Sequence, residues 1–144
     1  MLKVSDLMST ELFTLRRNDS LKTARSIMDL KRIRHIPIIT GENSFVGLLT
    51  HRDLLSATIS KLADIDSKTQ GEIDAGIPVG EIMNRDVKTI TPNTPLKECA
   101  YLLLHHKYGC LPVIENGENL VGIITEADFL KLTLNLMEAL EQSE

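Results

Sequence analysis

The sequence is poor in aromatic residues and cysteine, and it has no long apolar run. Phe, Trp and Tyr make up 3% of its 144 residues, and Trp is absent. Proteins that bind single-stranded nucleic acid stack the bases on aromatic side chains, so this composition argues against a nucleic-acid partner. No apolar run approaches the roughly 18 residues of a transmembrane helix. The N-terminal residues also lack the apolar stretch of a secretory signal.

The sequence also lacks the usual signatures of catalysis and metal binding. Cys99 and Cys110 are too far apart for a CxxC motif, and we interpret them as reduced core thiols of a cytoplasmic protein. His105 and His106 are adjacent, so on a helix they cannot share a metal as residues four apart would. No P-loop or GxGxxG motif is present, and no Ser, Cys or His has an evident activating partner. We therefore expect no enzyme activity, no catalytic residues and no metal site.

The net charge of −4 is distributed unevenly. Residues 1–55 carry nine Lys and Arg against six Asp and Glu, whereas the remainder carries seven against fourteen. A solvated surface with uneven charge would explain this pattern. The alternative is that the N-terminal half presents cations to an anionic ligand.

The sequence contains an internal repeat. With a shift of 75 positions, residues 4–55 align with residues 79–130 without a gap. Two copies predict two similar units, related by a pseudo-twofold axis. If one unit contributes to a ligand cleft, a second related cleft must exist. The aligned pairs include Val4 with Val79, Met8 with Met83, Leu21 with Leu96, Pro37 with Pro112, and Gly47 with Gly122.

Each copy predicts the element order strand, helix, strand, strand, helix. A short apolar lead-in precedes a brief strand at 13–15 or 88–90, and a helix with a periodic apolar stripe follows. Two strands joined by a tight turn come next, with Asn116-Gly117 as a strong hairpin signal in the second copy. A second helix begins at Thr50 or Thr125. We expect repeats over 1–63 and 79–144, and a linker or mobile loop over the polar residues 64–78.

The repeated pattern Gly-apolar-apolar-Thr-x-x-Asp carries the chemical content of the sequence. Thr50 and Thr125 stand where a strand leads into a helix, and Asp53 and Asp128 follow in the first helical turn. This pattern is typical of helix capping, which is worth roughly 0.5–1 kcal/mol for each interaction.

A ligand-binding interpretation uses the same geometry. The free N–H groups of a helix N-terminus and a Thr hydroxyl can bind phosphate, and an Asp carboxylate can accept both hydroxyls of a ribose. Leu48 and Ile123, just before the Thr residues, could pack against a base. Capping and binding are compatible, because a Thr can cap the helix while its Asp holds a ribose.

These motifs together resemble a tandem pair of CBS domains, named after cystathionine beta-synthase. The resemblance covers nearly the whole chain outside the linker. It rests on features that occur in the same order in both copies: the lead-ins ending in Met8 and Met83, Thr14-Leu15 and Thr89-Ile90, Arg34-His35-Ile36-Pro37 and Gly109-Cys110-Leu111-Pro112, and Gly47…Asp53 and Gly122…Asp128.

The resemblance implies an α/β fold of two pseudo-twofold-related β-α-β-β-α repeats packed sheet to sheet, with two clefts between the repeats. It also implies binding of an adenosine-containing ligand such as AMP, ADP, ATP or S-adenosylmethionine, a homodimer, and regulation of an effector protein without catalysis. Asp53 and Asp128 would hold ribose hydroxyls, Thr50 and Thr125 would touch phosphate, and Thr14 and Thr89 would border the adenine.

The two copies differ at the positions that the resemblance assigns to phosphate. Arg34 and His35 occupy these positions in the first copy, whereas Gly109 and Cys110 replace them in the second. The clefts are therefore expected to be unequal, with first-copy cations reaching a phosphate near Asp128 and Arg52 adding a cation to the other cleft. The leading hypothesis is a nucleotide-sensing regulatory module. The alternative is a structural dimerisation module whose clefts are empty or degenerate.

Overall fold

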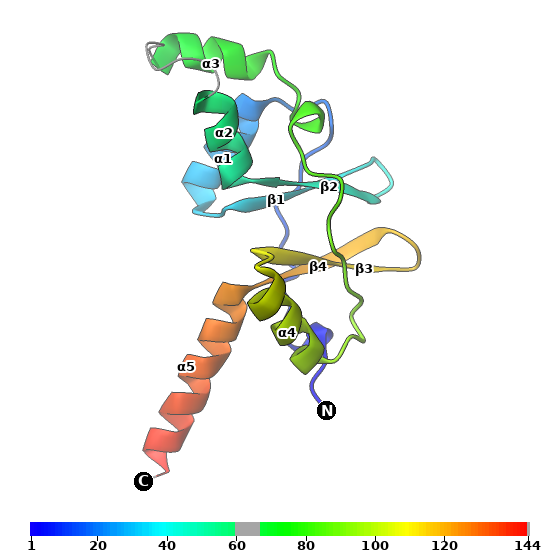
Figure 1. The fold of residues 1–144 in the computed structure, drawn as a ribbon, viewed down its shortest axis with the longest axis vertical. Helices are drawn as coiled ribbons and strands as arrows, with labels where there is room; N and C mark the ends of the chain where they lie inside the picture. The colour runs from blue at the N-terminus through cyan, green and yellow to red at the C-terminus, as the bar shows by residue number, and fades with distance from the viewer. Residues whose placement is uncertain (60–66, 144) are drawn as a thin grey trace. The chain divides into compact units, whose positions relative to one another are not determined.

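The computed structural model describes residues 1–59 and 67–143 (Figure 1). The chain divides into two compact units that do not follow the repeat boundaries expected at 1–63 and 79–144. Each unit combines one copy's helices and strands with the lead-in of the other copy. Unit 1 comprises Met1–Leu12, Lys88–Gly117 and Val121–Glu144, and unit 2 comprises Phe13–Val87 and Glu118–Leu120.

The helices and strands follow the predicted order in both copies. The first copy contributes α1 (Leu21–Lys31), β1 (His35–Ile39), β2 (Phe45–Thr50) and α2 (His51–Ile59). The second copy contributes α4 (Leu96–His106), β3 (Cys110–Glu115), β4 (Asn119–Thr125) and α5 (Glu126–Gln142). Each lead-in forms one turn of 3-10 helix, η1 (Val4–Asp6) and η2 (Val79–Glu81). The predicted mixed α/β class with two repeats is confirmed.

Helix α1 illustrates how the local sequence sets the helix boundaries. The Ser20 side chain accepts a hydrogen bond from the Thr23 N–H, which satisfies one of the free donors at the helix start. Leu21, Ala24 and Met28 recur at helical spacing and are buried. The helix ends at Arg32, whose φ of 54° places it in the left-handed region.

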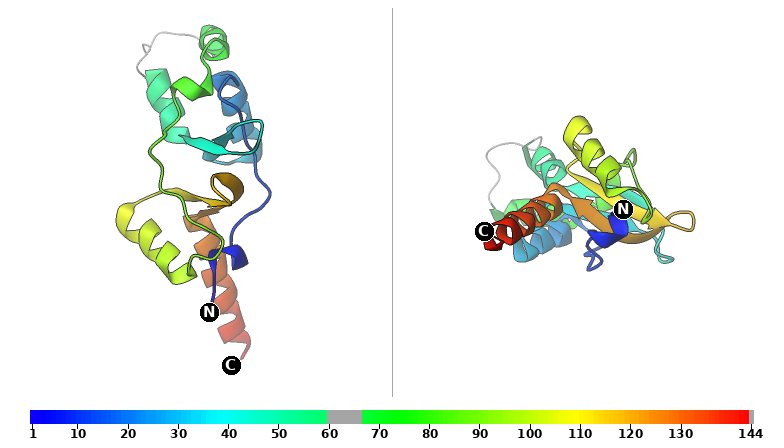
Figure 2. Two further views of the ribbon diagram at one scale, coloured as in Figure 1. Left: turned by 90° about the vertical axis from the view of Figure 1, so that its right-hand side faces the viewer. Right: turned by 90° about the horizontal axis from the view of Figure 1, so that it is seen from below.

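The chain forms two two-stranded sheets among the described residues. In unit 2, β1 and β2 pair antiparallel, with Pro37 opposite Leu48, and α1 and α2 cover one face of this pair (Figures 1 and 2). The first strand expected in each copy is reduced to one parallel bridge, which joins Leu15 to Ile38 in unit 2. In unit 1, β3 pairs with β4. Asn116 and Gly117 both have positive φ in the turn between them, as an Asn-Gly hairpin requires.

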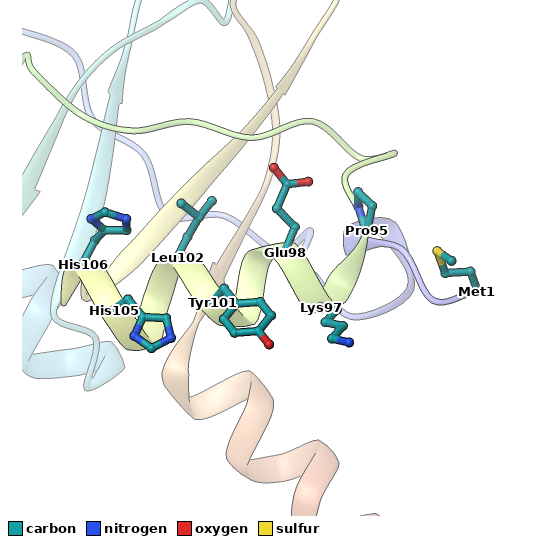
Figure 3. A pocket seen from close by; sticks show the side chains of 8 residues that line it. All are labelled: Met1, Pro95, Lys97, Glu98, Tyr101, Leu102, His105 and His106. Atoms are coloured by element: carbon teal, nitrogen blue, oxygen red, sulfur yellow. The ribbon is translucent and has the colours of Figure 1, made fainter.

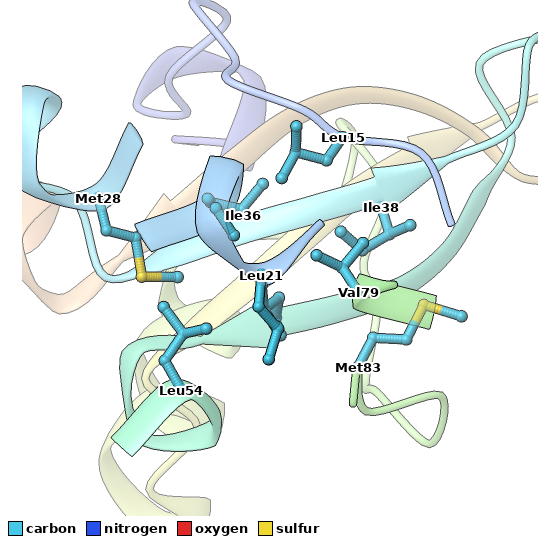
Figure 4. Close-up of a cluster of buried hydrophobic side chains, with 10 residues drawn as sticks. Leu15, Leu21, Met28, Ile36, Ile38, Leu54, Val79 and Met83 are labelled. Atoms are coloured by element: carbon cyan, nitrogen blue, oxygen red, sulfur yellow. The ribbon is translucent and has the colours of Figure 1, made fainter. Parts of the chain in front are cut away.

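The lead-ins are exchanged between the copies. Val79 and Met83 of the second lead-in lie in the core that surrounds α1 and β1, beside Leu21 and Ile38 (Figure 4). In unit 1, Val4 is a buried member of the core around α4 and β3, and Met8 packs against it. Backbone hydrogen bonds repeat the exchange at the 75-residue shift: Leu21 N–H donates to Ile77 C=O, and Leu96 N–H donates to Leu2 C=O, both at 2.9 Å.

Two glycines make room for the exchanged lead-ins. A Cβ on Gly47 would lie 2.5 Å from Met83 Sδ and 3.1 Å from the Asn84 carbonyl oxygen. A Cβ on the equivalent Gly122 would lie 2.6 Å from Met8 Sδ. Real side chains do not approach this closely, so only glycine allows the lead-in to pack against the strand.

Residues 64–78, which we expected to form a linker or mobile loop, contain a helix. Ser67–Ala75 forms helix α3, which packs on α1, whereas residues 64–66 lie outside the described residues. Asp74 is 2% exposed, and its Oδ2 lies 2.8 Å from Arg25 Nε on α1. A polar sequence without an apolar stripe gives no helical signal, and the ion pair joins this helix to a residue 49 positions away.

Candidate ligand-binding site

The junction of β2 and α2 contains a reciprocal hydrogen-bonded cap. Thr50 N–H donates to Asp53 Oδ2 at 2.8 Å, and Asp53 N–H donates to Thr50 Oγ1 at 3.1 Å. The helix begins here because these two bonds satisfy donors that the first turn would leave free. Both side chains are half-buried, so the cap remains partly accessible to solvent.

The junction of β4 and α5 repeats this arrangement with one difference. Thr125 N–H donates to Asp128 Oδ2 at 2.8 Å, as in the first copy. The Thr125 hydroxyl lies 3.4 Å from the same oxygen and donates to it. Both side chains are again half-buried. The capping interpretation is therefore correct for both copies.

Capping leaves binding capacity on each carboxylate. Oδ2 of Asp53 and Oδ2 of Asp128 accept the cap bonds. Within residues 1–59 and 67–143, no hydrogen bond reaches Oδ1 of either side chain. A carboxylate oxygen has two lone pairs and only accepts hydrogen bonds, so each junction can take a ligand that offers hydroxyl donors, such as a vicinal diol.

Three basic residues lie close to Asp53 along the backbone of unit 2. His35 pairs with Thr50 across the β1–β2 register, and the carbonyl oxygen of Arg34 accepts the His51 N–H at 2.8 Å. Arg34 and Arg52 are exposed, and His35 is half-buried. The structure therefore brings Arg34, His35 and Arg52 to the end of the sheet where Asp53 caps α2.

The residues expected to contact a base lie along the sheets. Thr14 and Thr89 are half-buried and precede the residues that form the parallel bridges. Leu48 is 6% exposed, whereas Ile123 is half-buried. Leu48 and Ile123 each lie two positions before the capping Thr of their own copy.

Sequence reasoning missed two lead-in residues next to these base positions. Leu48 and Asn84 exchange backbone hydrogen bonds of 2.9 Å in both directions, and Ile123 and Ser9 do the same at 2.9–3.0 Å. Each lead-in thus lines the strand just before the capping Thr. The alignment contains a signal, because Ser9 and Asn84 are equivalent polar residues that follow Met8 and Met83, but only the exchange places them there.

Buried thiols lie near Asp128 in unit 1. Burial raises the pKa of Cys110 from 9.0 to about 12, and the negative charge of Asp128 adds to this effect. Burial raises the pKa of Cys99 to about 11, with smaller effects from Asp128 and Glu98. Cys110 occupies the position that His35 has in the first copy, so the corresponding side chain beside Asp128 is a neutral thiol.

A comparison with protein-family models identifies the family of this chain. The model of the CBS domain matches twice, at residues 4–60 and 79–135. The chain belongs to the CBS domain family. Helix α3 lies between the two matched segments.

Relatives of the CBS pair differ in total length. A CBS domain-containing protein of Dictyostelium discoideum is 30% identical over 94% of this chain and 93% of its own length. An uncharacterized protein of Methanocaldococcus jannaschii is 32% identical over 90% of this chain, which spans only 42% of that protein. A homoserine O-acetyltransferase of Methanococcoides burtonii is 28% identical, and the chain spans 24% of it.

Solved structures share the fold over nearly the whole CBS pair. A proposed acetoin utilization protein (AcuB) from Vibrio cholerae has a TM-score of 0.82 at 38% identity and covers 100% of this chain and 98% of its own. CBSX2, solved in complex with AMP, has a TM-score of 0.79 at 27% identity, with 95% and 99% covered. The CBS pair of protein MJ0100, in complex with 5′-methylthioadenosine and S-adenosyl-L-methionine, has a TM-score of 0.76 at 25% identity, with 92% and 99% covered.

A surface depression on unit 1 lies apart from the predicted CBS site residues. It has a volume of about 500 Å³ and lies along α4 (Figure 3). None of the predicted site residues lines it. The depression is lined by Met1, Pro95, Lys97, Glu98, Tyr101, Leu102, His105 and His106.

No helix among the described residues combines the length and apolarity needed to cross a membrane.

Proposed function

We propose that this CBS pair is a regulatory module that binds an adenosine-containing ligand at its two strand-to-helix junctions. The observation that carries the proposal is the duplicated cap, in which Asp53 and Asp128 each use one oxygen for the helix and leave the other for a ligand. The AMP complex of CBSX2 and the 5′-methylthioadenosine and S-adenosyl-L-methionine complex of MJ0100 support this class of ligand.

Each group at the junction has a chemical task in this proposal. The two Asp carboxylates accept the ribose hydroxyls, and the adjacent helix N-termini with Thr50 and Thr125 hold the polar 5′ group. Arg34, His35 and Arg52 supply charge to a phosphate. The base packs near Leu48 or Ile123, next to Thr14 or Thr89. AMP, ADP, ATP and S-adenosylmethionine all contain the required ribose.

A bound ligand regulates only if it favours one conformation over another. α2 and α5 begin one residue after the capping Thr residues, so a ligand at a junction contacts the helix that leads away from it. The conformational change would be transmitted through these helices to an effector, either on the same polypeptide or on another protein. We assign no catalytic step to this module.

Isothermal titration calorimetry with AMP, ADP, ATP and S-adenosylmethionine tests the proposal. Asp53→Asn and Asp128→Asn are suitable variants, because an amide oxygen can still accept the Thr N–H while the amide nitrogen cannot accept from a ribose. We expect each change to weaken binding at its own junction by about tenfold to a hundredfold. Asp29→Asn on the exposed surface of α1 makes the same change of charge and should leave affinity unaltered. Unaltered affinity in both junction variants would refute the site.

The alternative function, a structural dimerisation module, is favoured by the exposed apolar face of α5. Leu130, Leu134, Met137 and Leu140 are 54–68% exposed, which is unusual for four such residues on one helix. In this case the two caps would serve the helices alone. Analytical ultracentrifugation would show a dimer, and none of the four ligands would bind or change the melting temperature.

A further inference from the structure

The C-terminal half of α5 lies outside the core of unit 1. Every residue from 133 to 142 is exposed, and Figure 1 shows this part of the helix projecting beyond α4 and the β3–β4 sheet. The match to the CBS domain ends at residue 135, whereas α5 continues to Gln142. Because short isolated helices are only marginally stable in water, a packing partner would stabilise this segment.

Apolar residues on α5 recur at the spacing of a coiled coil. Leu130, Leu134 and Met137 are separated by four and then three residues, which is the alternation of d and a positions in a heptad. They are 66%, 58% and 54% exposed. The next position of the same stripe is Glu141, and we call these four residues the α5 seam. This spacing of exposed apolar residues predicts packing against a second helix.

The charged residues beside the α5 seam indicate which helix fits it. Lys131 and Glu138 are seven residues apart, so both occupy the e position next to the seam. Among the described residues, neither forms an ion pair. The last turn of α5 has no basic residue and contains Glu141, although the helix dipole favours cations at this end. A partner that brings a cation to this end of α5 would therefore be favoured.

A second copy of α5 that runs antiparallel supplies this cation. When Leu134 faces Met137 of the second copy, Lys131 comes level with Glu138 of the second copy. The twofold axis between the copies repeats each of these contacts. In antiparallel pairs the e positions of the two helices lie on the same side of the seam, so opposite charges there can form ion pairs.

A parallel pair in register would be unfavourable. It would place the two Glu141 side chains against each other in the seam, and it would bring each Lys131 and each Glu138 level with its own equivalent. Like charges at short range repel. In the antiparallel pair, Glu141 lies instead level with Leu130 of the second copy, next to Lys131. The charge pattern therefore favours the antiparallel direction.

We propose that α5 is an interface at which two copies of this chain pair antiparallel through the α5 seam, with reciprocal Lys131–Glu138 ion pairs. The inference goes beyond the proposed function, because it needs no ligand, and beyond dimerisation as such, because it fixes the helix and its direction. It is compatible with ligand binding. Asp128 is two positions from Leu130, and side chains two positions apart on a helix do not face each other.

Sedimentation equilibrium of the full chain without ligand tests the pairing. We expect a concentration-dependent dimer, and Leu134→Glu should raise its dissociation constant by about a hundredfold or more, because it places unpaired carboxylates in the seam. Asn135→Glu adds the same charge one position away, off the seam, and should leave the constant unchanged. Both positions are exposed, so circular dichroism should show unaltered folding. A monomer at every concentration, or a dimer unaffected by Leu134→Glu, would refute the interface.

Disulfide cross-linking determines the direction of the pair. In the antiparallel pair, position 130 is level with position 141 of the second copy, but it is eleven residues along the helix, about 16 Å, from the other position 130. A disulfide requires Cα atoms within about 7 Å. Leu130→Cys alone should therefore not cross-link, whereas its mixture with Glu141→Cys should. Cys99 and Cys110 are buried and do not compete. Cross-linking of Leu130→Cys alone would show a parallel pair and overturn the proposal.

Charge reversal tests the register. Lys131→Glu and Glu138→Lys should each raise the dissociation constant of the dimer by about threefold to tenfold, because each opposes two like charges across the seam. The two changes combined in one chain restore opposite charges and should recover the affinity of the unaltered chain. If the combined variant associated no more tightly than the single variants, the proposed ion pairs would not form.

Discussion

Replacing Gly47 by alanine tests the packing of the exchanged lead-in. The new Cβ would lie 2.5 Å from Met83 Sδ, 3.0 Å from Met83 Cγ and 3.1 Å from the Asn84 carbonyl oxygen. The sulfur could move by rotation, but the backbone oxygen belongs to the lead-in that pairs with Leu48 and cannot move without breaking that pair. Overpacking of this kind costs about 1–3 kcal/mol.

Thermal unfolding followed by circular dichroism measures this cost. For a chain of this length, about 1–3 kcal/mol corresponds to a fall in melting temperature of about 2–12 °C. Gly122→Ala should behave alike, because its Cβ would lie 2.6 Å from Met8 Sδ. Gly71→Ala on α3 is the matched control: its Cβ would meet nothing within 4 Å, so the better helix former should add about 0.5–1 kcal/mol. If Gly47→Ala were as stable as Gly71→Ala, the lead-in would not be packed as described.

Further predictions concern the ion pair of α3, the buried thiols and one cap. Asp74→Ala should lower the free energy of unfolding by about 1–3 kcal/mol in urea, since it removes a buried partner of Arg25, which keeps some solvent contact; an unchanged midpoint would contradict a structural role for the pair. Both thiols hold their protons more tightly in the folded chain, with pKa values raised from 9.0 to about 11 for Cys99 and about 12 for Cys110. Their contribution to stability should therefore be complete below pH 9 and decline as the pH rises above it, and unfolding free energies measured across this range should decline less steeply for Cys110→Ala. Thr50→Ala should cost about 0.5–2 kcal/mol in the same unfolding assay, because it removes the hydroxyl that accepts the Asp53 N–H; no loss would mean that the observed bond does not stabilise the helix.

Local sequence signals predicted much of each repeat. Asn116-Gly117 forms the hairpin turn between β3 and β4. The second helices begin one residue after Thr50 and Thr125, as the capping pattern predicted. These features depend on neighbours within a few positions, and such neighbours are visible in the sequence.

Features that depend on distant residues could not be predicted in the same way. The expected strand at 13–15 is reduced to one bridge at Leu15, because its length is set by how much of β1 it can pair with. Helix α3 packs on α1 and is joined to it by the Arg25–Asp74 pair, which links residues far apart in the sequence. The capping bonds of the candidate site were predictable, whereas the positions of Ser9 and Asn84 beside Ile123 and Leu48 follow from the lead-in exchange.

The lead-in exchange has a consequence for how this chain could have arisen. A primordial polypeptide with a single copy would have lacked the segment that completes its own core, unless a sister molecule donated it. Two such molecules would each have given an N-terminal arm to the other, as in a domain-swapped pair. Duplication with fusion would then have made a concentration-dependent assembly intramolecular, and severing the chain midway should return both fragments to mutual dependence.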